Sequence, residues 1–120
     1  MRVLMLNGKP IGALRRKPKK GDVRSNISVG GLVEKYKLTK ADLHLCEQIG
    51  AKLVRDGIYY AGLDIINGKL IEVNVMSPGT LTDINKLNKV RLQEKIIDYL
   101  EEVIAQRHRL KEEFRPEQIV

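Results

Sequence analysis

A hairpin signal near the middle of this 120-residue sequence constrains its fold more than any other feature. Asn67-Gly68 lies between two runs of β-branched and aliphatic residues, and this pair strongly favours a tight turn between antiparallel strands. In the second run Glu72 and Asn74 alternate with apolar residues, which places both on one face of a strand. Such alternation is most often the solvated face of a sheet. A carboxylate beside an amide is also a pair of hard oxygen ligands, which suits Mg²⁺.

The register of this hairpin decides whether a third oxygen-bearing side chain joins that face. A strict two-residue turn pairs Ile66 with Lys69 and directs Asp64 into the apolar face, which is costly for a carboxylate. A turn that starts at Ile66, with Gly68 in a left-handed bulge position, slips the pairing by one residue and exchanges the faces. This second register separates polar from apolar residues, so we expect Asp64 on the polar face and a positive φ at Gly68. The apolar face would then carry Leu63, Ile65, Ile71, Val73 and Val75.

Several strings of the sequence together resemble one family. They are Arg16-Lys17-Pro18, Gly-Asp-Val-Arg-Ser-Asn at 21–26, Gly30-Gly31, Gly-Leu-Asp-Ile-Ile at 62–66, Glu-Val-Asn-Val at 72–75 and Ser77-Pro78. Their order and spacing are similar to the Mg-ATP-binding end of bacterial glutathione synthetase, an ATP-grasp ligase. The resemblance covers most of the chain.

The resemblance implies a role for particular residues. Magnesium ions that bridge the ATP phosphates would be held by Asp64, Glu72 and Asn74. The residues implied for ATP and phosphate are Arg16, Arg24, Asn26 and Asn74, and Arg24 and Arg16 would also act in catalysis on the transferred phosphate. Substrate contacts are implied for Gly30, Gly31, Ser77, Gly79 and Thr80. Gly79 stands where the family has Thr, and Thr80 follows one residue later.

The activity that the resemblance implies is an ATP-dependent carboxylate–amine ligase that works through an acyl phosphate. ATP is the co-substrate, Mg²⁺ or Mn²⁺ the metal, and small peptides or amino acids the substrates. The family's amino-terminal ATP-grasp lobe has no counterpart in this sequence, so we expect the chain to be incomplete alone and to need that lobe or a partner chain. A homo-oligomer stays open. The alternatives are a non-catalytic interaction module derived from the ATP-grasp fold and a basic nucleic-acid-binding module.

The charge pattern bears on the last alternative. The net charge of +7 arises in residues 1–40, which carry 11 Lys and Arg against two acids, whereas residues 41–120 carry 11 against 13. Six of the basic residues lie within residues 15–24, which indicates an anionic partner or a solvated loop. This cluster has no interleaved aromatic residues for base stacking, which disfavours nucleic acid.

Length and composition indicate one soluble globular domain, and the hairpin and helix patterns indicate an α+β fold. No apolar run is long enough to span a membrane, no secretory leader opens the sequence, and Cys46 alone forms no internal disulfide, so we expect a cytoplasmic location. We predict an antiparallel sheet of two hairpins, the first formed by residues 2–6 and 11–16, with two helices on its apolar face. Thr39 would cap the first helix, and Gly57 would end it. The second helix would begin near Val90. Residues 1–105 would form the carboxy-terminal ATP-grasp subdomain, and residues 106–120 a charged extension.

The apolar stripes of the two helices can be read from their spacing. The first would pack through Leu43, Cys46, Ile49, Leu53 and Val54, and the second through Ile96, Ile97, Leu100, Val103 and Ile104. His44 lies beside the first stripe, and we interpret it as a surface or boundary residue and not a ligand, because no partner lies at metal-ligand spacing.

Overall fold

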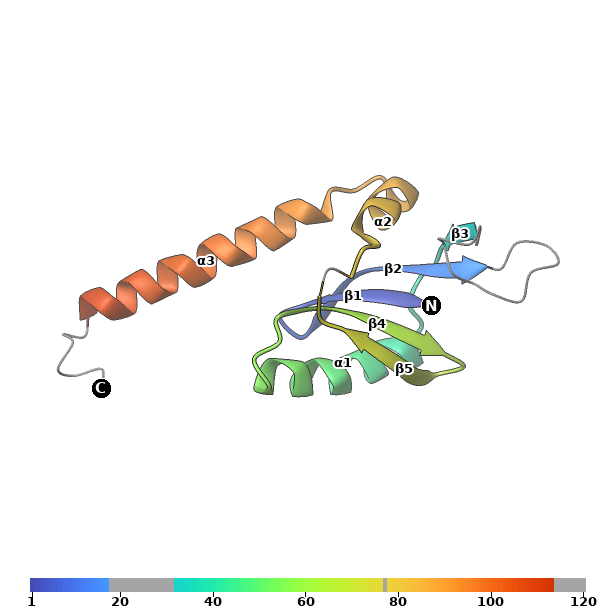
Figure 1. The fold of residues 1–120 in the computed structure, drawn as a ribbon, viewed down its shortest axis with the longest axis horizontal. Helices are drawn as coiled ribbons and strands as arrows, with labels where there is room; N and C mark the ends of the chain where they lie inside the picture. Colours follow the sequence, from blue (N-terminus) through green and yellow to red (C-terminus); the bar gives the residue numbers. More distant parts are fainter. Residues whose placement is uncertain (18–31, 77, 114–120) are drawn as a thin grey trace. The chain divides into compact units, whose positions relative to one another are not determined.

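The computed structural model describes residues 1–17, 32–76 and 78–113 of the chain. The chain divides into two units, residues 1–90 and residues 91–120, and each is described by itself. The first unit holds a five-stranded sheet with two helices, and the described part of the second is one long helix (Figure 1). The predicted α+β class is confirmed.

Two hairpins and one additional strand make up the sheet. Its strands are β1 (Arg2–Leu6), β2 (Lys9–Lys17), β3 (Leu32–Lys35), β4 (Tyr60–Ile66) and β5 (Lys69–Asn74), in the spatial order β3-β2-β1-β4-β5. Both predicted hairpins are present, and β1 joins them by pairing antiparallel with β4, where Arg2 lies opposite Asp64. The four-residue β3, which pairs with β2, was not predicted, since so short a run carries no clear period.

The first helix begins and ends where the sequence predicts. α1 (Lys40–Arg55) has Thr39 as its N-cap, and Thr39 Oγ1 accepts from the backbone N of Asp42 at 3.1 Å. The Asp42 carboxylate accepts in return from the Thr39 N at 2.9 Å, which completes the capping box. After the helix Gly57 adopts a φ of +79°, a conformation that glycine takes without steric cost.

The face of the sheet that α1 covers holds the main core. Its buried members are Val3, Met5, Ala13, Cys46, Leu53, Ala61, Leu63 and Ile65. Leu43 was predicted to belong to the packed stripe and is 46% exposed, because the buried stripe is centred on Cys46, Gly50 and Leu53. His44 is exposed, as predicted.

Gly50 brings the α1 backbone against the β1–β2 turn, and replacing it tests this packing. A Cβ at Gly50 would lie 2.1 Å from the carbonyl oxygen of Gly8. Alanine is favoured over glycine inside a helix by about 1 kcal/mol, but a clash with backbone outweighs that gain. We expect Gly50→Ala to lower the free energy of unfolding in denaturant by about 2 kcal/mol. The exposed helix substitution Gln48→Ala should change it by less than about 0.5 kcal/mol. A Gly50→Ala protein as stable as the wild type would contradict this packing.

A short helix lies on the face of the sheet opposite to α1. α2 (Leu81–Asn88) lies over β2 and β3 (Figure 1). Its Ile84 is completely buried. It was not predicted, because eight residues give barely two turns of apolar spacing. The sheet therefore carries a helix on each face, and the strip of the α2 face formed by β4 and β5 bears the candidate site.

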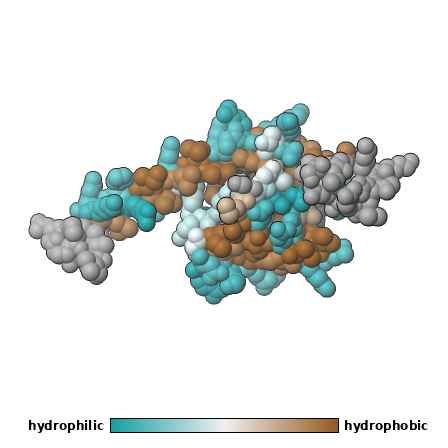
Figure 2. Space-filling view, in the orientation of Figure 1, coloured by the Kyte–Doolittle hydropathy of each residue, from teal (hydrophilic) through white to brown (hydrophobic). Residues whose placement is uncertain are grey.

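The second unit contains α3 (Leu92–Glu113), which continues without a break past residue 105. The predicted boundary between residues 105 and 106 therefore does not coincide with a helix end, and it stays a prediction. The packing of this helix on the sheet also stays a prediction. Of its predicted apolar stripe, Ile97, Leu100 and Ile104 are about half exposed, and apolar residues follow the helix in Figure 2. In the part of the chain that the structure describes, no helix is long and apolar enough to cross a membrane.

Candidate metal and phosphate site

The predicted polar face of the central hairpin is present. Asp64 pairs directly with Glu72, and Gly62 pairs with Asn74 in the next position of the same face. Since directly opposed residues of antiparallel strands point to one side, Asp64, Glu72 and Asn74 share a face of the sheet. Val73, which pairs with Leu63, lies on the opposite face.

The reason for this register differs from the predicted one. The turn has two residues, Asn67 and Gly68, with φ values of +52° and +73°, so that Ile66 does pair with Lys69. The positive φ of Gly68 is confirmed, but the bulged turn is wrong. The register shifts instead between Asp64 and Ile65, which pairs with Leu70.

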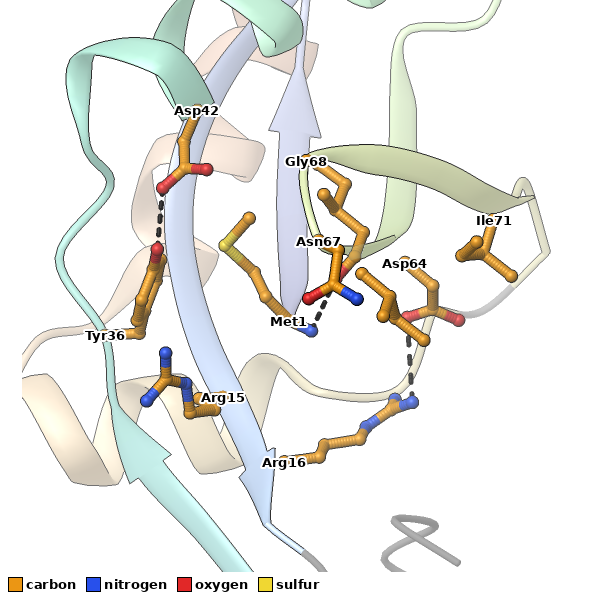
Figure 3. Close-up of a pocket in the computed structure, with 11 residues that line it drawn as sticks. Met1, Arg15, Arg16, Tyr36, Asp42, Asp64, Asn67, Gly68 and Ile71 are labelled. Atoms are coloured by element: carbon orange, nitrogen blue, oxygen red, sulfur yellow. Dashed lines mark hydrogen bonds and ion pairs between the residues drawn. The ribbon is translucent and has the colours of Figure 1, made fainter.

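The extra residue at this shift is Ile71, and it changes sides relative to the prediction. Leu70 pairs with Ile65 of the core face, so the next residue, Ile71, points to the other face, and its assignment to the apolar face was wrong. Ile71 lines a cavity together with Asp64 (Figure 3). A bulge re-aims side chains locally and increases the twist of the strand. Here it allows a tight turn and a polar face on the same hairpin.

Asp64 is bound by an arginine that the sequence analysis did not single out. Arg2 Nε donates to Asp64 Oδ1 at 2.7 Å, and Arg2 Nη2 donates to Oδ2 at 3.3 Å. The third contact runs from Arg2 Nη1 to the carbonyl oxygen of Pro78. The Arg2 side chain is only 6% exposed. The available signal was its place at the head of an apolar strand, where a charged side chain needs a buried partner.

This contact keeps Asp64 ionised. Burial alone would raise the pKa of the Asp64 carboxyl, but the hydrogen bond and charge of Arg2, with the charge of Arg16, hold that pKa below its ordinary value. The carboxylate is therefore negative at neutral pH. Each of its oxygens also keeps a further lone pair beside the one that Arg2 uses.

Arg16 carries a hydrogen-bond donor that no described residue accepts. Its Nη1 lies 3.6 Å from Asp64 Oδ1, and its Nε is buried without a hydrogen-bond partner among the residues that the structure describes. Burial and the nearby charge of Arg2 lower the pKa of Arg16, against the opposing charges of Asp64, Glu72 and Asp83. A buried donor without an acceptor costs about 1–3 kcal/mol, which an anionic ligand oxygen would recover.

A cavity of about 580 Å³ adjoins this pair of charges. Arg16 and Asp64 stand on one side of it, and Tyr36 and Asp42, which are hydrogen bonded at 2.8 Å, stand on the other (Figure 3). The turn residues Asn67 and Gly68 also line it. The cavity is thus mixed in charge, with arginines close to carboxylates.

The donor set of the hairpin fits magnesium. Glu72 is exposed, Asn74 is half-buried, and Asn74 Oδ1 accepts from the backbone N of Met76 at 3.3 Å. Over residues 1–17, 32–76 and 78–113 no three His, Cys, Asp or Glu side chains group together as metal ligands. The candidate ligands are therefore two carboxylates and one amide, all of them oxygen donors of the kind that Mg²⁺ prefers.

Of the remaining predicted site residues, Gly79 and Thr80 lie within the part of the chain that the structure describes. Gly79 is exposed with a φ of +79°, whereas Thr80 is buried and its Oγ1 has no hydrogen-bond partner in the described part of the chain. Arg24, Asn26, Gly30, Gly31 and Ser77 lie outside the described residues. Their implied roles stay predictions.

Comparison with known proteins identifies the class of protein. The family described as prokaryotic glutathione synthetase, ATP-grasp domain, matches residues 1–89. The chain belongs to this family.

Particular relatives show how much of such a protein this chain represents. It is 45% identical over 101 residues to glutathione synthetase from Gloeobacter violaceus, a match covering 84% of this chain and 31% of the relative. The corresponding proteins of a Nostoc and a Synechocystis species are 42% and 43% identical over 100 residues, covering 83% of this chain and 31% of each relative. The chain thus spans about a third of the length of these relatives.

Proposed function

We propose that this chain is the metal- and phosphate-binding part of an ATP-dependent carboxylate–amine ligase that forms glutathione. The observation that carries the proposal is the shared face of Asp64, Glu72 and Asn74, with the buried Nε of Arg16 close by. Glutathione is the product named for the relatives. No nucleophile from the protein is needed, because ATP activates the carboxylate.

Each residue of the site has a distinct role in this proposal. Asp64, Glu72 and Asn74 would hold Mg²⁺, which when bound offsets phosphate charge and orients the transfer. Arg16 donates from its buried Nε to an oxygen of the transferred phosphoryl group, where charge-assisted hydrogen bonds are strong. Arg24 and Asn26 contact the same phosphate, while Gly30, Gly31, Ser77, Gly79 and Thr80 contact the peptide or amino-acid substrates.

The rest of the ligase would come from a further lobe. The chain spans about a third of its relatives, so we infer that an amino-terminal ATP-grasp lobe, on the same or a partner polypeptide, completes the nucleotide cleft. The proposed working state is cytoplasmic, with ATP as co-substrate. Polynucleotide is a poor competitor for this face, since two carboxylates repel a phosphate chain that brings no metal.

A chimeric enzyme tests the proposed function. In the Gloeobacter violaceus glutathione synthetase, this chain would replace the matching 31% of the sequence. We expect the chimera to form ADP and glutathione in the presence of Mg²⁺, because the replaced segment would bring its own metal and phosphate ligands. The chain alone should turn over ATP poorly, since it spans about a third of its relatives and the proposed amino-terminal lobe would complete the nucleotide site.

Two results would contradict the proposal. One is a chimera that folds with the melting temperature of its parent yet forms no glutathione, which would favour a non-catalytic interaction module. The other is nanomolar binding of duplex DNA by the 120-residue chain at physiological salt, which would favour the nucleic-acid alternative.

A further inference from the structure

Arg2 is the most deeply buried ionisable side chain at the candidate site. It heads β1, lies opposite Asp64 on β4 and uses all three of its nitrogens as donors. Two of the three contacts go to Asp64, an implied metal ligand. The third goes to the Pro78 carbonyl, in the loop implied for substrate contact.

β4 has a glycine, Gly62, where the Arg2 side chain lies across it. A Cβ added to Gly62 would lie 2.7 Å from Pro78 Cβ and 3.1 Å from Arg2 Nη1. Gly62 pairs with Asn74 and is itself buried. The missing side chain at Gly62 therefore leaves room for Arg2 to cross β4 and reach the loop.

Stability alone does not account for this arrangement. Desolvating a guanidinium and a carboxylate costs about as much as their attraction returns, and well-packed apolar residues in such positions are often as stable or more stable. Arg2 does not belong to the apolar cluster under α1. What a planar guanidinium does offer is several donors in a rigid fork, which fixes two acceptors relative to each other.

We propose that Arg2 is a positioning residue that holds the Asp64 carboxylate and the Pro78 carbonyl in one fixed arrangement, so that the metal ligand and the loop after β5 keep a constant spacing. This inference rests on the proposed metal role of Asp64. The positive charge of Arg2 opposes a bound cation, so its contribution lies in geometry and not in charge.

The charge-conserving substitution Arg2→Lys separates these two contributions. A lysine keeps the charge but has a single ammonium group, which lacks the spacing needed to contact Asp64 and Pro78 in the same way. The test titrates Mn²⁺ with ATP into the chimera, in which the amino-terminal lobe is present, and follows paramagnetic broadening of backbone amide signals by NMR. Arg55→Lys, an exposed change on α1, is the matched control.

In the wild type and in Arg55→Lys, Mn²⁺ should broaden the amides near Asp64, Glu72 and Asn74 at the same concentration. In Arg2→Lys the same broadening should need about tenfold more Mn²⁺. The amide of Gly79 should broaden less than in the wild type even when the amides of the hairpin are broadened. A folded Arg2→Lys protein with the wild-type Mn²⁺ response would overturn the positioning role while leaving the proposed function intact. A wild type without broadening at this hairpin would instead remove the metal site and the proposed function with it.

Gly62→Ala provides a second variant in case Arg2→Lys does not fold. It keeps the arginine and its charge but displaces the guanidinium and Pro78, because the added Cβ meets both. Its amide spectrum first establishes that it folds. A rise in the Mn²⁺ requirement then supports the positioning role, and an unchanged requirement overturns it.

Discussion

Replacing Asp64 by asparagine should lower the free energy of unfolding at neutral pH by about 3 kcal/mol. The change removes the charge that faces Arg2, whose side chain is 6% exposed, and leaves a buried guanidinium without its counter-ion. Breaking such a pair from one side typically costs about 3–5 kcal/mol, and the 19% exposure of Asp64 favours the lower end. Denaturant unfolding of the two proteins measures this difference.

The same pair makes stability depend on pH in a defined direction. Because the pKa of Asp64 is depressed in the folded chain, its contribution is complete above the ordinary aspartate pKa of about 4 and is lost as the pH falls through the folded value. The loss of stability between pH 5 and the acid limit should therefore be smaller in Asp64→Asn than in the wild type.

Asp56→Asn is the control for both measurements. Asp56 is half exposed and pairs with Lys52 within one helical turn, so its loss should cost less than about 0.5 kcal/mol. Equal effects of the two substitutions would contradict the expected cost of leaving the buried Arg2 guanidinium without its counter-ion.

The hairpins and the first helix were predictable because their signals are local. Asn67-Gly68 and Asn7-Gly8 specify their turns through left-handed backbone angles, and Thr39 with Asp42 specifies a helix start within four residues. The face of Asp64 was predicted correctly from the cost of burying a carboxylate. The position of the bulge was not, because a bulge at Ile71 and one at the turn both place Asp64 on the face of Glu72 and Asn74.

What the sequence did not reveal depends on distant contacts. The hydrogen-bond acceptors of the Arg2 side chain, on Asp64 and Pro78, lie 62 and 76 positions further along the chain, and no local pattern encodes these contacts. Leu43 was assigned to the core from spacing alone, but the docking of Gly50 on the β1–β2 turn rotates the helix stripe away from it. The shared face of Asp64, Glu72 and Asn74 could therefore be predicted, whereas the arginine that donates to Asp64 could not.

A substitution at Glu72 can test the proposed metal role separately from the stability of the fold. Unlike Asp64, Glu72 is exposed, so Glu72→Gln should change the free energy of unfolding by less than about 0.5 kcal/mol. The substitution keeps the shape of the side chain but removes the carboxylate that would bind Mg²⁺. Loss of a direct metal ligand should lower turnover at least about a hundredfold, equivalent to about 2.7 kcal/mol.

The most direct test of the metal site is the Mg²⁺-dependent rate of glutathione formation by the chimera carrying Glu72→Gln. Glu47→Gln, an exposed change on α1, is the matched control and should keep the rate of the unsubstituted chimera. We expect Glu72→Gln to lose at least about a hundredfold in rate while its unfolding free energy stays unchanged. A Glu72→Gln chimera that keeps both its rate and its Mg²⁺ dependence would contradict the assignment of this hairpin as the metal site.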